Sequence, residues 1–268
     1  MFVVMRPTAP ALAPFVESFW YFAGRLPPGR ERVLPSGEVQ LLVNLHSDEL
    51  RTYAGDGRVH RVGGAALQGA YRGPVVIDTA QQRAIVGVGF RAGGAYPFFA
   101  VPPSAVRDGL VPLDDLWGRD GAVLRDRLLS ADGPAGVLRA LEAALLARVA
   151  RPLEPDPAVG YAVAAFDRGG ATVGAVTERL GMTGKRFVRR FTEHVGLTPK
   201  RFARIRRLQR VIRSIAGGAP VDWARLAAET GFYDQAHLIH DFRSLAGLRP
   251  SEYRPRTPRE RNHVPLPG

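Results

Sequence analysis

Cysteine is absent from the 268-residue chain, and so are long apolar runs. Without thiols the protein forms no disulfide, thiolate metal site or cysteine nucleophile. The six histidines are scattered and lack HExxH or comparable spacing, so we expect neither a metal nor another cofactor. The longest apolar run, Val39–Leu45, is strand-sized and far below the ~18 residues of a membrane helix. The N-terminal apolar stretch is too short for a signal peptide. We therefore expect a cytoplasmic protein without membrane contact.

Lysine is scarce too, because only Lys185 and Lys200 stand among 37 basic residues. Arginine at this frequency, together with abundant Gly, Ala and Pro, is typical of a bacterial protein from a GC-rich genome. Residues 1–150 hold 16 basic and 14 acidic side chains, whereas residues 151–268 hold 21 and 11. The second half therefore carries almost all of the net charge of +12. This asymmetry predicts a polyanion as the partner of that half.

A pattern occurs twice between Thr172 and Tyr253. Gly181 and Gly231 are 50 residues apart, and four further pairs are spaced by 51: Phe191/Phe242, Gly196/Gly247, Pro199/Pro250 and Phe202/Tyr253. Self-similarity at a fixed spacing indicates a repeated structural unit. We interpret each copy as a helix-turn-helix motif and expect the pair to bind DNA.

The start and stop signals within each copy support this interpretation. Thr172 and Asp222 are suitable N-caps for the first helices, and glycine follows each helix at 181 and 231, where positive φ is tolerated. The second helices should begin at Thr183 or Gly184 and at Asp234. Between the copies, Thr198-Pro199 starts a helix that extends to about Ile215 and spans ~27 Å. That length could hold two reading helices in successive major grooves, which lie about 34–36 Å apart.

Residues 185–213 carry eleven basic side chains against the single acid Glu193. Guanidinium groups suit both phosphate and the O6/N7 edge of guanine. A solvent-exposed helix face without a binding role could contain the same basic residues. Because this cluster lies beside a tandem motif, DNA contact is the favoured interpretation. The candidates for phosphate contact are Arg190, Lys200, Arg201, Arg204, Arg207 and Arg243.

The first half has strand and turn signals followed by helical spacing. Four short segments rich in Val and Ile, bounded by Gly, Pro or Asp, lie at 38–45, 58–67, 74–78 and 83–90. They predict a small antiparallel sheet or barrel, followed by helices between Leu124 and Val149. The overall fold class is thus α+β. An aromatic cluster could line an apolar pocket or form ordinary core: Phe15, Phe19, Trp20, Tyr21 and Phe22. No acid/base pair or nucleophile constellation indicates an enzyme.

The second copy, GFYDQAHLIHDFRSLAGLRPSEYR, resembles the signature of the AraC/XylS family of transcriptional regulators. The positions that match are Gly231, Phe232, Asp234, Gln235, Leu238, Phe242, Arg243, Gly247, Pro250, Tyr253 and Arg254. The first copy is similar to the family's degenerate copy at Leu180, Gly181, Phe187, Arg189, Phe191, Gly196, Thr198, Pro199 and Phe202. The resemblance covers about 158–256 and implies a seven-helix, all-α DNA-binding domain in which a long helix joins two helix-turn-helix motifs.

The resemblance also implies base-contact roles. The first reading helix would present Lys185, Arg186 and Arg189, with Val188 against a thymine methyl. The second would present Gln235, His237 and His240. This chain departs from the family at position 236, which is Ala where Ser or Thr is usual, and at His240, where Arg is frequent. Base readout by the second helix is therefore expected to be weaker or pH-sensitive.

These observations predict a sequence-specific transcriptional regulator that is not an enzyme. Residues 1–150 would sense an effector or dimerise, 151–157 would be a linker, 158–256 would bind DNA, and 257–268 would be a flexible basic tail. Double-stranded promoter DNA is the expected partner. A small-molecule effector, a second copy of the chain and, for an activator, RNA polymerase are further candidates. Two alternatives stay open: a hydrolase or transferase in residues 1–150 docked to DNA, and a sequence-independent architectural DNA binder.

Overall fold

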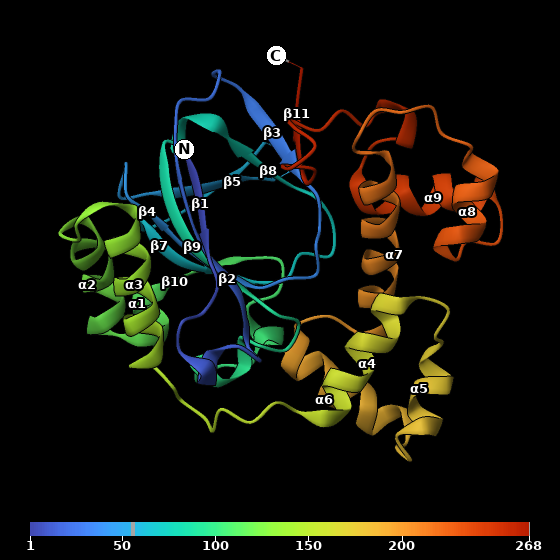
Figure 1. The fold of residues 1–268 in the computed structure, drawn as a ribbon, viewed down its shortest axis with the longest axis horizontal. Helices are drawn as coiled ribbons and strands as arrows, with labels where there is room; N and C mark the ends of the chain where they lie inside the picture. Colours follow the sequence, from blue (N-terminus) through green and yellow to red (C-terminus); the bar gives the residue numbers. More distant parts are fainter. Residues whose placement is uncertain (55–56, 268) are drawn as a thin grey trace.

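The computed structural model describes residues 1–54 and 57–267 and contains a β-sheet domain beside a helical domain (Figure 1). The strands coloured blue to green come from the first part of the chain, whereas the helices coloured yellow to red and one red strand, at residues 263–265, come from the second. The predicted α+β fold, with an antiparallel N-terminal domain and an all-α C-terminal domain, is confirmed.

Two antiparallel sheets build the N-terminal domain. Over the described residues the first sheet has the order β1 (Phe2–Met5), β2 (Val16–Ala23), β9 (Ala84–Phe90), β4 (Gln40–Asn44), β7 (Ala65–Gln68) and β10 (Leu110–Pro112). The second has the order β11 (His263–Pro265), β3 (Arg30–Val33), β8 (Val75–Asp78), β5 (Leu50–Tyr53) and β6 (Val59–Val62). The register of the long central pair β2/β9 places Phe19 opposite Val88 and Tyr21 opposite Val86.

One predicted strand is divided. The segment 58–67 forms β6 and β7, which belong to different sheets. The chain turns between them at Gly64, whose backbone N–H donates to the carboxylate of Asp48 at 3.0 Å. A Cβ at this position would lie only 2.7 Å from that oxygen. A glycine that permits such close approach marks a corner rather than the interior of a strand.

Short helices cover one side of the first sheet (Figure 1). They are α1 (Leu113–Trp117), α2 (Arg119–Leu129) and α3 (Gly133–Leu146), with the 3-10 turns η1 (Pro10–Leu12), η2 (Thr79–Gln81), η3 (Tyr96–Phe98) and η4 (Pro103–Ala105) elsewhere in the domain. Within the aromatic cluster, Phe15 and Phe19 are buried in the core. The Trp20 ring lies so close to Gly87 that a Cβ there would be 2.5 Å from it. These rings fill the space beside the sheet.

The helical domain contains α4 (Pro157–Arg168), α5 (Val173–Arg179), α6 (Gly184–Val195), α7 (Pro199–Ile215), α8 (Trp223–Thr230), α9 (Gln235–Ala246) and the 3-10 turn η5 (Pro250–Glu252). The predicted caps are confirmed, since the side chains of Thr172 and Asp222 accept from the backbone N–H groups of Ala175 and Arg225 at 3.1 and 3.0 Å. Both motif glycines adopt positive φ, 60° at 181 and 82° at 231. The apolar stripe of α7 is buried: Phe202, Ile205, Leu208, Ile212 and Ile215.

The connecting helix α7 also packs on the N-terminal domain. Gln209 donates from Nε2 to the carbonyl of Pro35 at 2.8 Å, and Arg206 donates to that of Ser36 at 3.4 Å. Gly37, with φ of 80°, brings the backbone against the ring of Phe202. A Cβ added at Gly37 would lie 3.3 Å from that ring. The two domains therefore share a buried contact in this conformation.

The C-terminal segment differs from the flexible tail that the sequence suggested. His263–Pro265 forms β11, pairs with β3 and buries Val264. Glu31 of β3, 1% exposed, accepts from Arg256 at 2.9 Å and pairs with His263 at 2.7 Å. The edge strand β3 thus binds the C-terminal segment through its backbone groups and the buried Glu31 carboxylate. The composition of that segment by itself indicates only a basic, irregular tail.

Candidate nucleic-acid interface

The first reading helix is α6. Thr183 caps it by accepting from the N–H of Arg186 at 3.4 Å. Phe187 and Phe191 recur at a spacing of four and are buried, so they face the domain interior. The predicted base-contact residues occupy the opposite, exposed face: Lys185, Arg186, Val188 and Arg189. Folding therefore brings these four side chains together on one accessible surface.

The second reading helix is α9. Asp234 caps it by accepting from the N–H of His237 at 2.7 Å. Gln235 and His240 are exposed, as predicted for base contacts. His237 is half-buried, because its ring packs edge-on against Phe232 at 5.3 Å between centroids. Its Nδ1 also lies 3.3 Å from the backbone nitrogen of Tyr233. His237 thus orders the turn before the helix.

Sequence reasoning missed Tyr233. Its side chain is 92% exposed and directly precedes the cap of α9. An exposed aromatic ring with a phenolic hydroxyl can both stack on a base and donate a hydrogen bond. The signal was present in the sequence, because Phe232 occupies the core position of the turn and leaves the next side chain outside.

The candidates for phosphate contact divide into two groups. Lys200 and Arg243 are exposed. Four others bind within the protein. Arg190 pairs with Asp156 at 2.5 Å, Arg201 donates to the carbonyl of Arg72, and Arg204 and Arg207 both pair with Asp241. Arg207 additionally stacks over Phe232 at 4.3 Å.

Asp241 connects the second reading helix to the connector. Its carboxylate, on α9, receives three hydrogen bonds from Arg204 and Arg207 of α7 at 2.5 to 3.0 Å. Burial by itself would raise the pKa of Asp241, but the hydrogen bonds and charges of the two guanidiniums outweigh it and hold the pKa below its usual value. The carboxylate is therefore ionised at neutral pH and fixes α9 on α7.

Asp156 attaches the first reading helix, α6, to α4. It caps α4 by accepting from Ala158 and Val159 at 3.0 and 3.1 Å. The same carboxylate pairs with Arg190 of α6. Burial would raise its pKa, yet these hydrogen bonds lower it overall. Each reading helix is thus attached to a neighbouring helix by a carboxylate-arginine contact.

Residues 1–54 and 57–267 contain neither a cluster of metal ligands nor a membrane-spanning helix. No group of three or more His, Cys, Asp or Glu side chains there is placed to hold a metal ion. Among these residues there is also no helix with the length and apolar character needed to cross a membrane.

Two families match separate parts of the chain. The family described as "Helix-turn-helix domain" matches residues 176–256. The family described as "Domain of unknown function (DUF6597)" matches residues 5–112. No curated protein matches the sequence.

Solved structures with a related arrangement have low sequence identity. Apo ToxT from Vibrio cholerae strain SCE256 is 11% identical, with 88% of this chain and 96% of that one covered and a TM-score of 0.47. ToxT of the same strain bound to an unsaturated fatty acid is 10% identical, with 94% of each chain covered and a TM-score of 0.44. The C-terminal domain of AraT, a response regulator from Geobacillus stearothermophilus, is 18% identical, with 37% and 84% covered and a TM-score of 0.34.

Two helix-turn-helix motifs on one connecting helix, with exposed polar and basic reading faces, define a DNA-binding transcription regulator. More narrowly, the chain carries an AraC-type helix-turn-helix domain at its C-terminal end, joined to an N-terminal domain of unknown function.

Proposed function

We propose that the protein binds a specific promoter sequence through α6 and α9 and that its N-terminal domain controls this binding. The observation that carries the proposal is the exposure of two different sets of polar side chains at equivalent places in the two motifs. Lys185, Arg186 and Arg189 suit guanine and phosphate, whereas Gln235 suits adenine. Different chemistry at equivalent places favours reading of an asymmetric sequence over uniform binding to the backbone.

The test is selection of bound duplexes from a random library with the full-length protein at physiological salt. We expect one enriched motif, or a pair of motifs if two copies bind together. The affinity for that motif should fall steeply as salt is raised, because phosphate contacts release counterions. Equal affinity for selected and random duplexes would support an architectural DNA binder instead.

Variants then separate base reading from charge. Arg189→Ala should weaken binding to the selected duplex more than to a random duplex, by about 1–3 kcal/mol if Arg189 contacts a guanine. Arg139→Ala, on the exposed surface of α3, removes the same charge far from both motifs and should leave both affinities unchanged. Equal loss on both duplexes for Arg189→Ala would assign this side chain to phosphate contact.

A further inference from the structure

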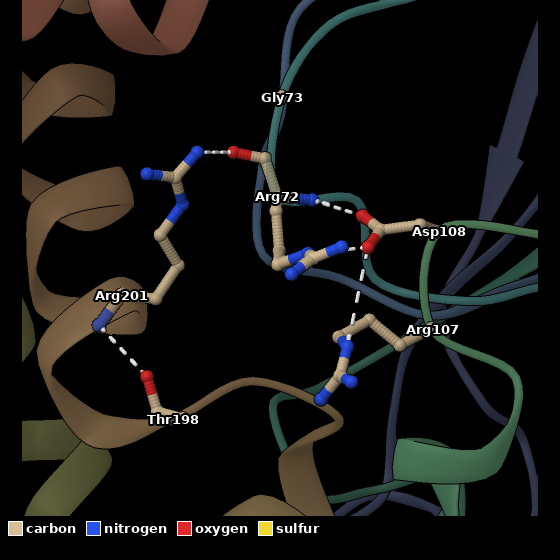
Figure 2. A pocket seen from close by; sticks show the side chains of 6 residues that line it. All are labelled: Arg72, Gly73, Arg107, Asp108, Thr198 and Arg201. Atoms are coloured by element: carbon tan, nitrogen blue, oxygen red, sulfur yellow. Dashed lines mark hydrogen bonds and ion pairs between the residues drawn. The ribbon is translucent and has the colours of Figure 1, made fainter.

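A cavity of about 680 Å³ lies between the two domains, and arginine dominates its lining (Figure 2). The N-terminal domain contributes Arg72, Gly73, Arg107 and Asp108, and the start of α7 contributes Thr198 and Arg201. The lining thus contains three guanidiniums and one carboxylate. The cavity has an excess of two positive charges.

The N-terminal side of the cavity is built from two loops held together by backbone bonds. Gly69 donates to the carbonyl of Gly109 at 2.9 Å, and Asp108 donates to that of Ala70 at 3.3 Å. Asp108, with φ of 58°, accepts from the backbone N–H of Arg72 at 2.6 Å and from its Nε at 2.5 Å. Asp108 therefore fixes the orientation of Arg72. The terminal nitrogens of that side chain extend toward α7 (Figure 2).

Each side of the cavity contributes one arginine whose hydrogen bonds are incomplete. Arg201 donates from Nη2 to the carbonyl of Arg72 and thereby joins the two domains. Among the described residues, the Nε atoms of Arg201 and Arg107 are buried and have no hydrogen-bond partner. Arg107 Nε lies 3.9 Å from Asp108, beyond hydrogen-bond distance. Buried donors without acceptors are unfavourable, and an anion in the cavity would supply acceptors.

The charges around Arg201 also favour a bound anion. Burial first, and then the positive charges of Arg204 and Arg72, lower the pKa of Arg201. Its guanidinium therefore lies in a partly desolvated, positively charged environment. A bound anion relieves both effects, because charge-assisted hydrogen bonds from arginine to phosphate or carboxylate are among the stronger ones in proteins.

We propose that this cavity binds a small anionic ligand through a phosphate or carboxylate group held by Arg72, Arg107 and Arg201. The ligand bridges the N-terminal domain and the first turn of α7, the helix that carries both reading motifs. The effect of ligand binding on regulation rests on the proposed function. An occupied cavity fixes the orientation of the two domains and so alters the affinity of the protein for DNA. The effector site then lies between the domains, outside the core that Phe19 and its neighbours fill.

The experiment measures thermal unfolding of the full-length protein in inorganic phosphate, in citrate and in chloride at matched ionic strength. A ligand that binds only the folded state raises the midpoint with its concentration. We expect a rise with phosphate or citrate above chloride, and the more effective anion identifies which group the natural ligand carries. The apparent affinity should fall about tenfold or more in Arg107→Gln, because one charged hydrogen bond is lost. Arg139→Gln should respond like the unmodified protein.

Arg72→Gln supplies a second test if Arg107→Gln fails to fold. An equal rise in all variants would mean non-specific ion binding and overturn the proposal, as would the absence of a rise with either anion. Duplex binding without added anion separates the alternatives further. If Arg107→Gln then weakens it as much as Arg189→Ala does, the cavity holds a DNA phosphate and the proposal is wrong. If the anion response is present but no duplex motif is enriched, the site stands and the proposed function fails.

Discussion

Substitution of Asp241 by Asn tests whether the connector arginines serve structure rather than DNA binding. Asp241 is 4% exposed and accepts hydrogen bonds from Arg204 at 3.0 and 2.5 Å and from Arg207 at 2.8 Å. Asparagine keeps the shape of the side chain, removes the charge and replaces one acceptor by a donor that faces a guanidinium. We therefore expect α9 to lose its main polar attachment to α7.

The size of the effect follows from burial. Removing one partner of a buried ion pair costs about 3–5 kcal/mol. The side chains of Arg204 and Arg207 are 28% and 21% exposed and keep part of their hydration. The loss in the free energy of unfolding should therefore fall at or below the lower limit of that range, at about 2–3 kcal/mol. The assay is urea unfolding at neutral pH, and Asp132→Asn, at an exposed position without a side-chain cap bond, is the control.

The pH dependence gives an independent check. The pKa of Asp241 is lower in the folded protein than its usual value, because the two arginines outweigh the effect of burial. Its stabilisation is therefore complete above the pKa of the unfolded chain and is lost as pH falls through the folded pKa. The difference in the free energy of unfolding between the unmodified protein and Asp241→Asn should decrease only at acidic pH. If stability were unchanged while Arg204→Ala and Arg207→Ala weakened DNA binding, the reasoning would be refuted.

Three further substitutions test other contacts. Burial alone would raise the pKa of Glu31, but its hydrogen bonds, led by the one to His263, lower it. Glu31→Gln should therefore speed hydrogen exchange of the backbone amides of His263 and Val264 at neutral pH, and unchanged exchange would contradict the pairing. Gly37→Ala combines φ of 80° with a ring 3.3 Å away and should lower stability in thermal unfolding by about 1 kcal/mol or more. Tyr233→Ala should weaken binding to the selected duplex and leave the unfolding midpoint unchanged, whereas full affinity would exclude a DNA contact.

Gly217→Ala is the matched control for the glycine substitution. Gly217 is exposed after α7, and nothing lies within 4 Å of the place of its Cβ. It should leave the unfolding midpoint nearly unchanged. A loss equal to that of Gly37→Ala would mean that the interdomain contact contributes little.

Local signals in the sequence predicted the motif architecture well. Caps at Thr172 and Asp222, and positive φ after the first motif helices, depend on residues within one turn of each other. Such interactions involve residues that are close together in the sequence, so residue type and spacing alone predicted their positions. The antiparallel sheet was predicted on the same basis, whereas the corner at Gly64 depends on Asp48, which is distant along the chain.

The partners of the arginines could not be predicted, because they lie far away in the sequence. Arg190 pairs with an aspartate 34 residues earlier, and Arg204 with one 37 residues later. The net charge calculated from composition includes such arginines as if they were available to DNA. In the folded protein, however, their charges are balanced by the aspartates with which they pair. The pairing of His263 with Glu31 spans 232 residues, and a strand of three residues carries too little apolar pattern to indicate it.

The contacts of the two reading helices with the N-terminal domain are alike in position. At the C-terminal end of α6, His194 stacks on Tyr96 at 3.9 Å between ring centroids. At the end of α9, Gly247 accepts from Arg32 at 3.1 Å. The N-terminal turns of both helices, which carry the exposed candidate base contacts, stay accessible. The N-terminal domain therefore contacts both helices near their C-terminal ends without covering their reading faces. The ligand proposed at the start of α7 would act on the same geometry, since α7 joins the two motifs.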